Sequence, residues 1–257
     1  MNRINELFKS KKSNILSVYF TAGFPNLNDT VNIIKELEAA GVDMIEIGMP
    51  FSDPLADGPV IQNSSTIALS NGMSLNILFD QLKDIRSQVS IPLVLMGYVN
   101  PVLQYGYEKF CKKCKEVGID GLIIPDLPIS EYTTELKPYT TANGLSSIFL
   151  ISPQTSDERI RLIDRESDGF IYVVSTSATT GAIGRFSDDQ ISYFLKVNQM
   201  NLSNPLMVGF GISNNNTFES VCKYANGAII GSAFINALKE SKDLKTSIHS
   251  FVNKIRG

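Results

Sequence analysis

Eight short apolar runs, rich in β-branched residues and separated by amphipathic stretches, constrain the fold of this chain more than any other feature. The runs cover residues 15–21, 44–48, 92–98, 121–125, 147–151, 169–174, 206–209 and 227–230. Near-continuous apolarity is typical of parallel strands that are buried on both faces. Apolar residues at helical spacing occur between and after the runs, at 30–40, 75–88, 107–117, 130–143, 156–165, 188–198, 214–224 and 243–256.

Strands that each lead into a helix predict an α/β fold in which the sheet closes into a (β/α)8 barrel of the TIM type. A chain of 257 residues suits one such barrel, and no linker divides it, so we expect residues 1–257 to form a single catalytic domain. We also expect a short extra helix at the N-terminus. A doubly wound open sheet is the alternative, and it fits less well because no G-x-G-x-x-G follows the first run.

Charge and composition exclude several functions. A net charge of −3 gives no strong attraction to nucleic acid or to an anionic membrane. No apolar stretch resembles a signal peptide or a membrane span, so we expect a cytoplasmic protein. The single histidine, His249, argues against Ser-His-Asp or Cys-His catalysis and against a multi-histidine metal site. Cys111 and Cys114 form a lone C-x-x-C, for which incidental positions in a helix are favoured over a metal or redox role.

Glu46 is the first candidate catalytic residue. Strand alternation places Met44, Glu46 and Gly48 on one face of the second run, which we expect to point into the barrel. Active sites of such barrels lie at the carboxyl ends of the strands, and burial raises the pKa of a carboxyl group toward neutrality, as suits a general acid or base. The alternative is a core glutamate bonded to backbone or to another polar side chain.

The loop that follows, residues 49–59, contains three prolines and presents Asp53 and Asp57 above the barrel mouth. Turn or capping roles are the ordinary explanation of such aspartates. An inward glutamate and a loop aspartate nevertheless form a pair in unlike environments, and such pairs commonly divide the roles of acid and base.

Two glycine-rich turns predict a phosphate site. Gly209 ends the seventh run and Gly211 follows it, and Gly231 with Ser232 follows the eighth. Glycine lets backbone N–H groups approach an anion, and the loops after strands seven and eight are the usual phosphate site of these barrels. Tight-turn geometry explains one such loop well and both less well. No P-loop motif is present, which argues against a nucleoside triphosphate.

Residues 46–59 (EIGMPFSDPLADGP) resemble the signature of the tryptophan synthase alpha subunit family. Further resemblance lies at 20–25 (FTAGFP), 125–128 (PDLP), 209–213 (GFGIS) and 231–233 (GSA), in order and along essentially the whole chain. The resemblance implies a cofactor-free lyase of tryptophan biosynthesis that cleaves indole-3-glycerol phosphate to indole and glyceraldehyde 3-phosphate.

The resemblance also implies residue roles. Glu46 would protonate the indole carbon that carries the side chain and take the proton of the side-chain hydroxyl. Asp57 would stabilise the positive charge at the indole nitrogen and accept its proton. The family's indole pocket matches Tyr19, Met96, Ile123, Tyr172 and Phe210, although each of these is equally explained as barrel filling. By resemblance, Gly181 helps to bind the phosphate, together with Gly211, Gly231 and Ser232 of the two glycine-rich turns.

The long, small and polar segment 175–188 resembles the family's lid over the active site, in which Thr180 contacts Asp57. The family often shows Gly-Val-Thr-Gly where this chain has Ala-Thr-Thr-Gly at 178–181. The Thr-Gly pair is therefore present, although the residues before it differ.

The family implies a partner, a pyridoxal-phosphate-dependent beta subunit in an alpha2-beta2 complex. Asp53, Pro54 and the Asn100-Pro101 segment match its contact region, and the pyridoxal phosphate belongs to the partner. Asp126 is interpreted as structural.

The alternatives are a non-catalytic alpha-like subunit that regulates its partner, a stand-alone indole-releasing lyase, and another phosphate-binding barrel isomerase. Indole-glycerol-phosphate synthase would need a lysine acid at a strand end, and none lies in a matching position.

Overall fold

The computed structural model describes residues 2–175 and 186–257. Each strand pairs in parallel with the next along the chain, and the last pairs with the first, so the sheet is a closed barrel. The strands are β1 (Ile15–Thr21), β2 (Met44–Gly48), β3 (Leu93–Met96), β4 (Gly121–Ile123), β5 (Ser146–Ile151), β6 (Ile171–Val174), β7 (Leu206–Gly209) and β8 (Gly227–Ile230). This topology confirms the predicted (β/α)8 barrel.

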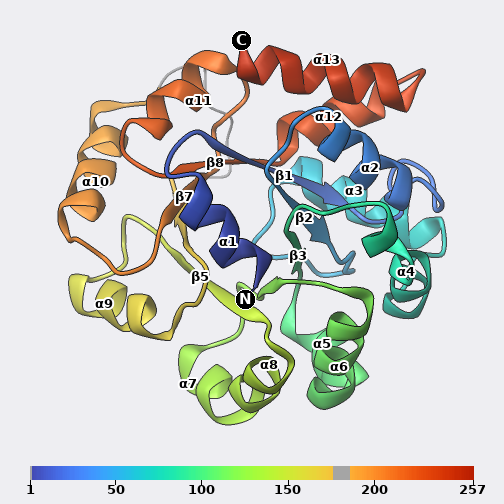
Figure 1. Cartoon of the computed structure of the whole chain (residues 1–257), viewed down its shortest axis with the longest axis horizontal. Helices are drawn as coiled ribbons and strands as arrows, with labels where there is room; N and C mark the ends of the chain where they lie inside the picture. The colour runs from blue at the N-terminus through green and yellow to red at the C-terminus, as the bar shows by residue number, and fades with distance from the viewer. Residues whose placement is uncertain (1, 176–185) are drawn as a thin grey trace.

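Helices surround the barrel, and the expected N-terminal helix α1 lies across one end of it (Figure 1). The helices are α1 (Arg3–Ser10), α2 (Thr30–Ala39), α3 (Pro59–Ser70), α4 (Leu75–Leu82), α5 (Val99–Tyr105), α6 (Tyr107–Val117), α7 (Ile129–Glu131), α8 (Lys137–Asn143), α9 (Asp157–Glu166), α10 (Asp188–Gln199), α11 (Asn215–Cys222), α12 (Ser232–Lys239) and α13 (Leu244–Arg256). Among these helices, none is long and apolar enough to cross a membrane.

Four helical segments differ from the sequence-based expectation, and one of them is α5, which was not predicted. The helix expected at 75–88 ends at Leu82 and continues only as a 3-10 turn at Ile85–Ser87. The helix expected at 130–143 is interrupted by a π-helical turn at Tyr132–Leu136, because Pro138 has no N–H to continue the regular ladder. Helix α3 was not predicted, since its small polar residues give it little apolar periodicity.

The barrel interior is filled by apolar side chains from the inward-facing strand positions. Ile4 and Phe8 of α1 pack against this interior cluster from the N-terminal end of the strands. The cluster's strand and pre-strand residues are Ile15, Met44, Val94, Ile123, Ile148, Phe170, Tyr172, Met207 and Ile229. Helix α1 therefore covers the N-terminal end of the barrel, opposite the carboxyl ends of the strands.

A buried ion cluster ties α1 to this end of the barrel. Asp120, which is 4% exposed, accepts hydrogen bonds from the guanidinium groups of Arg86 and Arg3. It also accepts a hydrogen bond of 2.9 Å from the backbone N–H of Leu93, the first residue of β3. Removing the carboxylate would leave the charge of Arg86 largely buried and without its ionic partner.

We therefore expect Asp120→Ala to lower the free energy of unfolding by about 3–5 kcal/mol, as for other broken buried ion pairs. Lys196→Ala is the control, because it breaks an ion pair with Asp157 whose partners are 54% and 59% exposed. Its expected cost is below about 1 kcal/mol. Urea unfolding monitored by circular dichroism measures both, and equal losses for the two variants would contradict the assigned role of Asp120.

Candidate active site

Glu46 lies on β2 and is fully buried inside the barrel. The hydroxyl of Ser17 on β1 donates a hydrogen bond of 3.0 Å to Oε1 of Glu46. The other carboxyl oxygen, Oε2, has no hydrogen-bond partner within the described parts of the chain. Burial raises the pKa of Glu46 to about 8, and the hydrogen bond from Ser17 acts in the opposite direction. Glu46 is therefore largely protonated at neutral pH.

Asp57 lies in the loop between β2 and α3 and is half-buried. The hydroxyl of Tyr98, just after β3, donates a hydrogen bond of 3.0 Å to Oδ2 of Asp57 and accepts one of 3.1 Å from the backbone N–H of Ala56. Burial raises the pKa of Asp57 to about 6, against the lowering effect of the Tyr98 hydrogen bond. Asp57 is therefore mostly ionised at neutral pH, unlike Glu46.

Two tyrosines stand beside these carboxyl groups. Tyr19 is opposite Glu46 in the pairing of β1 with β2, and both Tyr19 and Tyr172 are buried. Burial raises the pKa of each phenol, and Asp57 and Glu46, which are both ionised at the alkaline pH where a phenol titrates, raise both pKa values further. Both phenols therefore remain neutral.

Glycines on the neighbouring strands make room for these phenols. A Cβ atom on Gly48 would fall 2.2 Å from the Tyr19 hydroxyl oxygen. A Cβ atom on Gly209 would fall 2.1 Å from the Tyr172 hydroxyl oxygen. Both contacts are far shorter than any real Cβ contact, so the two tyrosine positions depend on glycine at these sites.

The remaining predicted pocket residues lie at the carboxyl ends of their strands. Met96 and Ile123 end β3 and β4, and Phe210 directly follows β7. The rings of Phe210 and Tyr172 meet edge to face, with 6.4 Å between their centroids. Phe210 has a φ of +70°, a strained conformation for a bulky residue, and its carbonyl oxygen accepts a hydrogen bond of 2.8 Å from the Ser175 hydroxyl.

The two predicted phosphate turns differ in how their helices begin. The N-terminus of α11 is satisfied by its own side chains, a reciprocal capping pair formed by Asn214 and Thr217. Helix α12 begins at Ser232, directly after Gly231, and no side chain caps it. Its first backbone N–H groups are therefore the better donors for an anion. A Cβ atom on Gly231 would lie 3.4 Å from the Tyr19 ring, so this turn adjoins the pocket.

Thr180 and Gly181 lie outside the described residues, as does the whole 178–181 segment, so their predicted roles stay predictions. Gly211 lies within the described residues and has a φ of +75°, which glycine adopts without strain. Sequence reasoning missed two polar residues that contact the carboxyl groups, Ser17 and Tyr98. Strand alternation from Tyr19 marks Ser17 as inward-facing, and Tyr98 ends the third apolar run.

Other residues considered from the sequence have structural partners. Nε2 of His249 on α13 lies within hydrogen-bond distance, 2.9 Å, of Oε2 of Glu36 on α2. Cys111 and Cys114 are buried on α6, and Asp126 accepts a hydrogen bond of 2.9 Å from the backbone N–H of Val99. Within the described ranges, no group of histidine, cysteine and acidic side chains could hold a metal ion.

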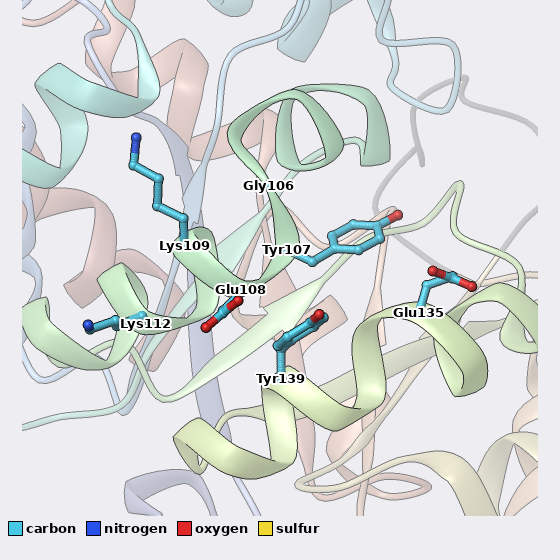
Figure 2. A pocket seen from close by; sticks show the side chains of 7 residues that line it. All are labelled: Gly106, Tyr107, Glu108, Lys109, Lys112, Glu135 and Tyr139. Carbon is cyan, nitrogen blue, oxygen red and sulfur yellow. The ribbon is translucent and has the colours of Figure 1, made fainter.

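An open depression of about 520 Å³ lies between α6 and α8, and Figure 2 shows the side chains that line it. Its lining carries both signs of charge and contains none of the candidate site residues. The lining residues are Gly106, Tyr107, Glu108, Lys109, Lys112, Glu135 and Tyr139. Because opposite charges are mixed at an open surface, the depression favours neither an anionic nor a cationic ligand.

Comparison with known proteins bears on the whole chain. The family model described as tryptophan synthase alpha chain matches residues 6–255. The tryptophan synthase alpha chain of Flavobacterium johnsoniae is 60% identical over 256 residues, which cover 100% of both chains. That of Bacteroides thetaiotaomicron is 58% identical over 248 residues, covering 96% of this chain and 97% of the relative.

Solved structures agree with these matches. Tryptophan synthase subunit alpha from Legionella pneumophila superposes with a TM-score of 0.89 at 34% identity, covering 100% of this chain and 97% of that one. A chain of tryptophan synthase from M. tuberculosis, in an aminoacrylate-bound form, gives a TM-score of 0.87 at 27% identity, covering 100% and 98%. The resemblance found in the sequence is thereby confirmed, and the chain belongs to the tryptophan synthase alpha chain family.

Proposed function

We propose that Glu46 and Asp57 are the catalytic carboxyl groups of this chain. As a member of its family, the chain is a lyase of tryptophan biosynthesis that cleaves indole-3-glycerol phosphate. The observation that carries the assignment is the difference between the two groups. Glu46 is fully buried with a pKa of about 8, whereas the half-buried Asp57 has a pKa of about 6. One group is therefore a proton donor at neutral pH while the other is an anion.

The cleavage uses these two states directly. Glu46 donates its proton to the indole carbon that carries the side chain, which leaves a positive charge on the ring nitrogen. Asp57 stabilises that charge electrostatically. The carbon–carbon bond then breaks, its electron pair neutralises the ring, and the side-chain hydroxyl becomes the aldehyde of glyceraldehyde 3-phosphate. The hydroxyl proton returns to Glu46, so the site is restored without a cofactor.

The surrounding residues supply binding. The indole occupies the apolar surface at the carboxyl ends of the strands, formed by Tyr19, Met96, Ile123, Tyr172 and Phe210. The phosphate binds at Gly211, Gly231 and Ser232, and the uncapped N-terminus of α12 supports this assignment. Thr180 and Gly181 would complete the site from the lid, as the resemblance implies.

We also propose that the chain assembles with a beta subunit in an alpha2-beta2 complex, as its family membership implies. Two strongly exposed leucines support a protein contact at this end. Leu55 is 92% exposed in the loop after β2, and Leu103 is 57% exposed on α5. Leu55 lies in the same loop as Asp53 and Pro54, and Leu103 lies on the same helix as Asn100. Both leucines are thus next to residues that match the family's contact region. Pyridoxal phosphate belongs to the beta subunit, not to the alpha chain.

Residues 1–257 are proposed to act as one catalytic domain, because the barrel uses strands from β1 to β8 and helix α1 closes it. A cytoplasmic location stays a prediction. A purely regulatory alpha-like subunit is disfavoured, because both carboxyl groups are present and occupy unlike environments.

The direct test is release of indole from indole-3-glycerol phosphate, with and without a beta subunit. Glu46→Gln should lower kcat by about 10²–10⁴, since a positioned acid or base contributes that much, while leaving substrate affinity nearly unchanged. Asp57→Asn should also lower kcat strongly. Glu158→Gln, which alters an exposed carboxylate on α9, is the control and should keep full activity. Full turnover by Glu46→Gln would refute the assigned acid.

The two pKa values predict a bell-shaped pH dependence. Asp57 must be ionised, so kcat/KM should rise as the pH increases through about 6. Glu46 must be protonated, so kcat/KM should fall as the pH increases through about 8. Steady-state measurement of kcat/KM between pH 5 and pH 10 covers both limbs, because kcat/KM reports the pKa values of the free enzyme. A rate that continues to increase above pH 9 would contradict a protonated Glu46 as the acid.

A further inference from the structure

Ser17 is a buried polar residue at a place where the barrel interior is otherwise mostly apolar. It lies on β1, is 0% exposed, and pairs with Met44 of β2, one inward position before the pair of Tyr19 with Glu46. Its hydroxyl approaches Oε1 of Glu46 to 3.0 Å. An inward serine therefore contacts the proposed acid from the strand beside it.

The two oxygens of Glu46 are thereby made unlike. Oε1 accepts the Ser17 hydrogen bond, whereas Oε2 is fully buried and has no partner among the described residues. A buried carboxyl oxygen without a partner costs free energy, which a ligand atom or a bound proton can recover. A hydroxyl that donates to Oε1 also reduces the basicity of that oxygen, so a proton is held on Oε2.

We propose that Ser17 is a positioning residue of the reaction, which anchors Oε1 of Glu46 so that Oε2 carries the proton exchanged with the substrate. This inference rests on the proposed role of Glu46 as the acid. Ser17 itself touches neither the reacting carbon nor the leaving hydroxyl. It acts by fixing the rotation of the carboxyl group and by assigning the mobile proton to one oxygen.

The other ionisable groups around Glu46 do not replace this contact. They are Tyr19 on β1, Tyr172 on β6 and Asp57 in the loop after β2. The adjacent strand β3 presents Val94 and Met96, which have no ionisable group. Neither phenol donates a hydrogen bond to Glu46, and Asp57 is itself an acceptor. Among the described residues, the Ser17 hydroxyl is therefore the donor that makes the two oxygens of Glu46 unlike.

The test compares the full-length wild-type chain and Ser17→Ala in indole release across the pH range. Ser17→Ala should lower kcat about 10-fold, the size expected for losing a hydrogen bond to an ionisable group, with KM changed less than about 2-fold. Because the lost bond favours the carboxylate, the pKa of Glu46 should increase, and the alkaline limb should move upward by about one pH unit.

Two further variants separate positioning from packing. Ser17→Thr keeps a hydroxyl and should return the alkaline limb to its wild-type position. Ser146→Ala is the matched control, because Ser146 is a fully buried serine on β5 whose hydroxyl donates to Asp168 at 3.3 Å. It should leave the pH profile unchanged. Should Ser17→Ala fail to fold, Ser17→Cys, with its weak S–H donor, serves for the same comparison.

Measuring Glu46→Gln beside the Ser17 variants separates a wrong role for Ser17 from a wrong role for Glu46. If Glu46→Gln is inactive but Ser17→Ala keeps the wild-type kcat and alkaline limb, the inference about Ser17 is overturned while Glu46 stands. A loss of stability without a shifted limb, or an equal shift in Ser17→Thr, overturns it too, because either result assigns Ser17 to packing. An active Glu46→Gln would instead refute the proposed function.

Discussion

The site depends on one interaction, the removal of the Glu46 carboxyl group from water inside a closed barrel. Full burial raises its pKa to about 8, so the side chain holds a proton that a solvated glutamate would lose. The barrel provides this environment because Ile4 and Phe8 of α1 cover the opposite end and apolar side chains fill the layers between. The same chain without that cover would admit water beneath the acid.

The second carboxyl group works because it is held differently. Asp57 is carried by a loop outside the barrel, where partial exposure and the Tyr98 hydrogen bond limit the rise of its pKa to about 6. Two carboxyl groups from one short stretch of chain thus have different charge states near neutral pH, because Glu46 is neutral and Asp57 is negative. Gly48 and Gly209 leave the space that two neutral tyrosines fill beside them, which keeps the environment apolar without adding charge.

Much of this was predictable from local sequence. The observed bounds of β1, β2, β7 and β8 are those of the predicted runs, because buried parallel strands show near-continuous apolarity. Alternation along β2 alone gave the direction of Glu46. Helix α3 was missed because small polar residues hide its periodicity. Ser17 and Tyr98 were missed because their bonds join residues 29 and 41 positions apart, so their roles depend on strand register and loop path.

The central claim is that Glu46 is a neutral acid at neutral pH, and infrared spectroscopy measures this directly. The difference between spectra of the wild-type chain and Glu46→Gln isolates the carbonyl stretch of the protonated Glu46 carboxyl group, which can be followed through a pH titration. We predict that this band is present at pH 6 and disappears with a midpoint near 8. Absence of the band at pH 6, with only the carboxylate band visible, would contradict the account.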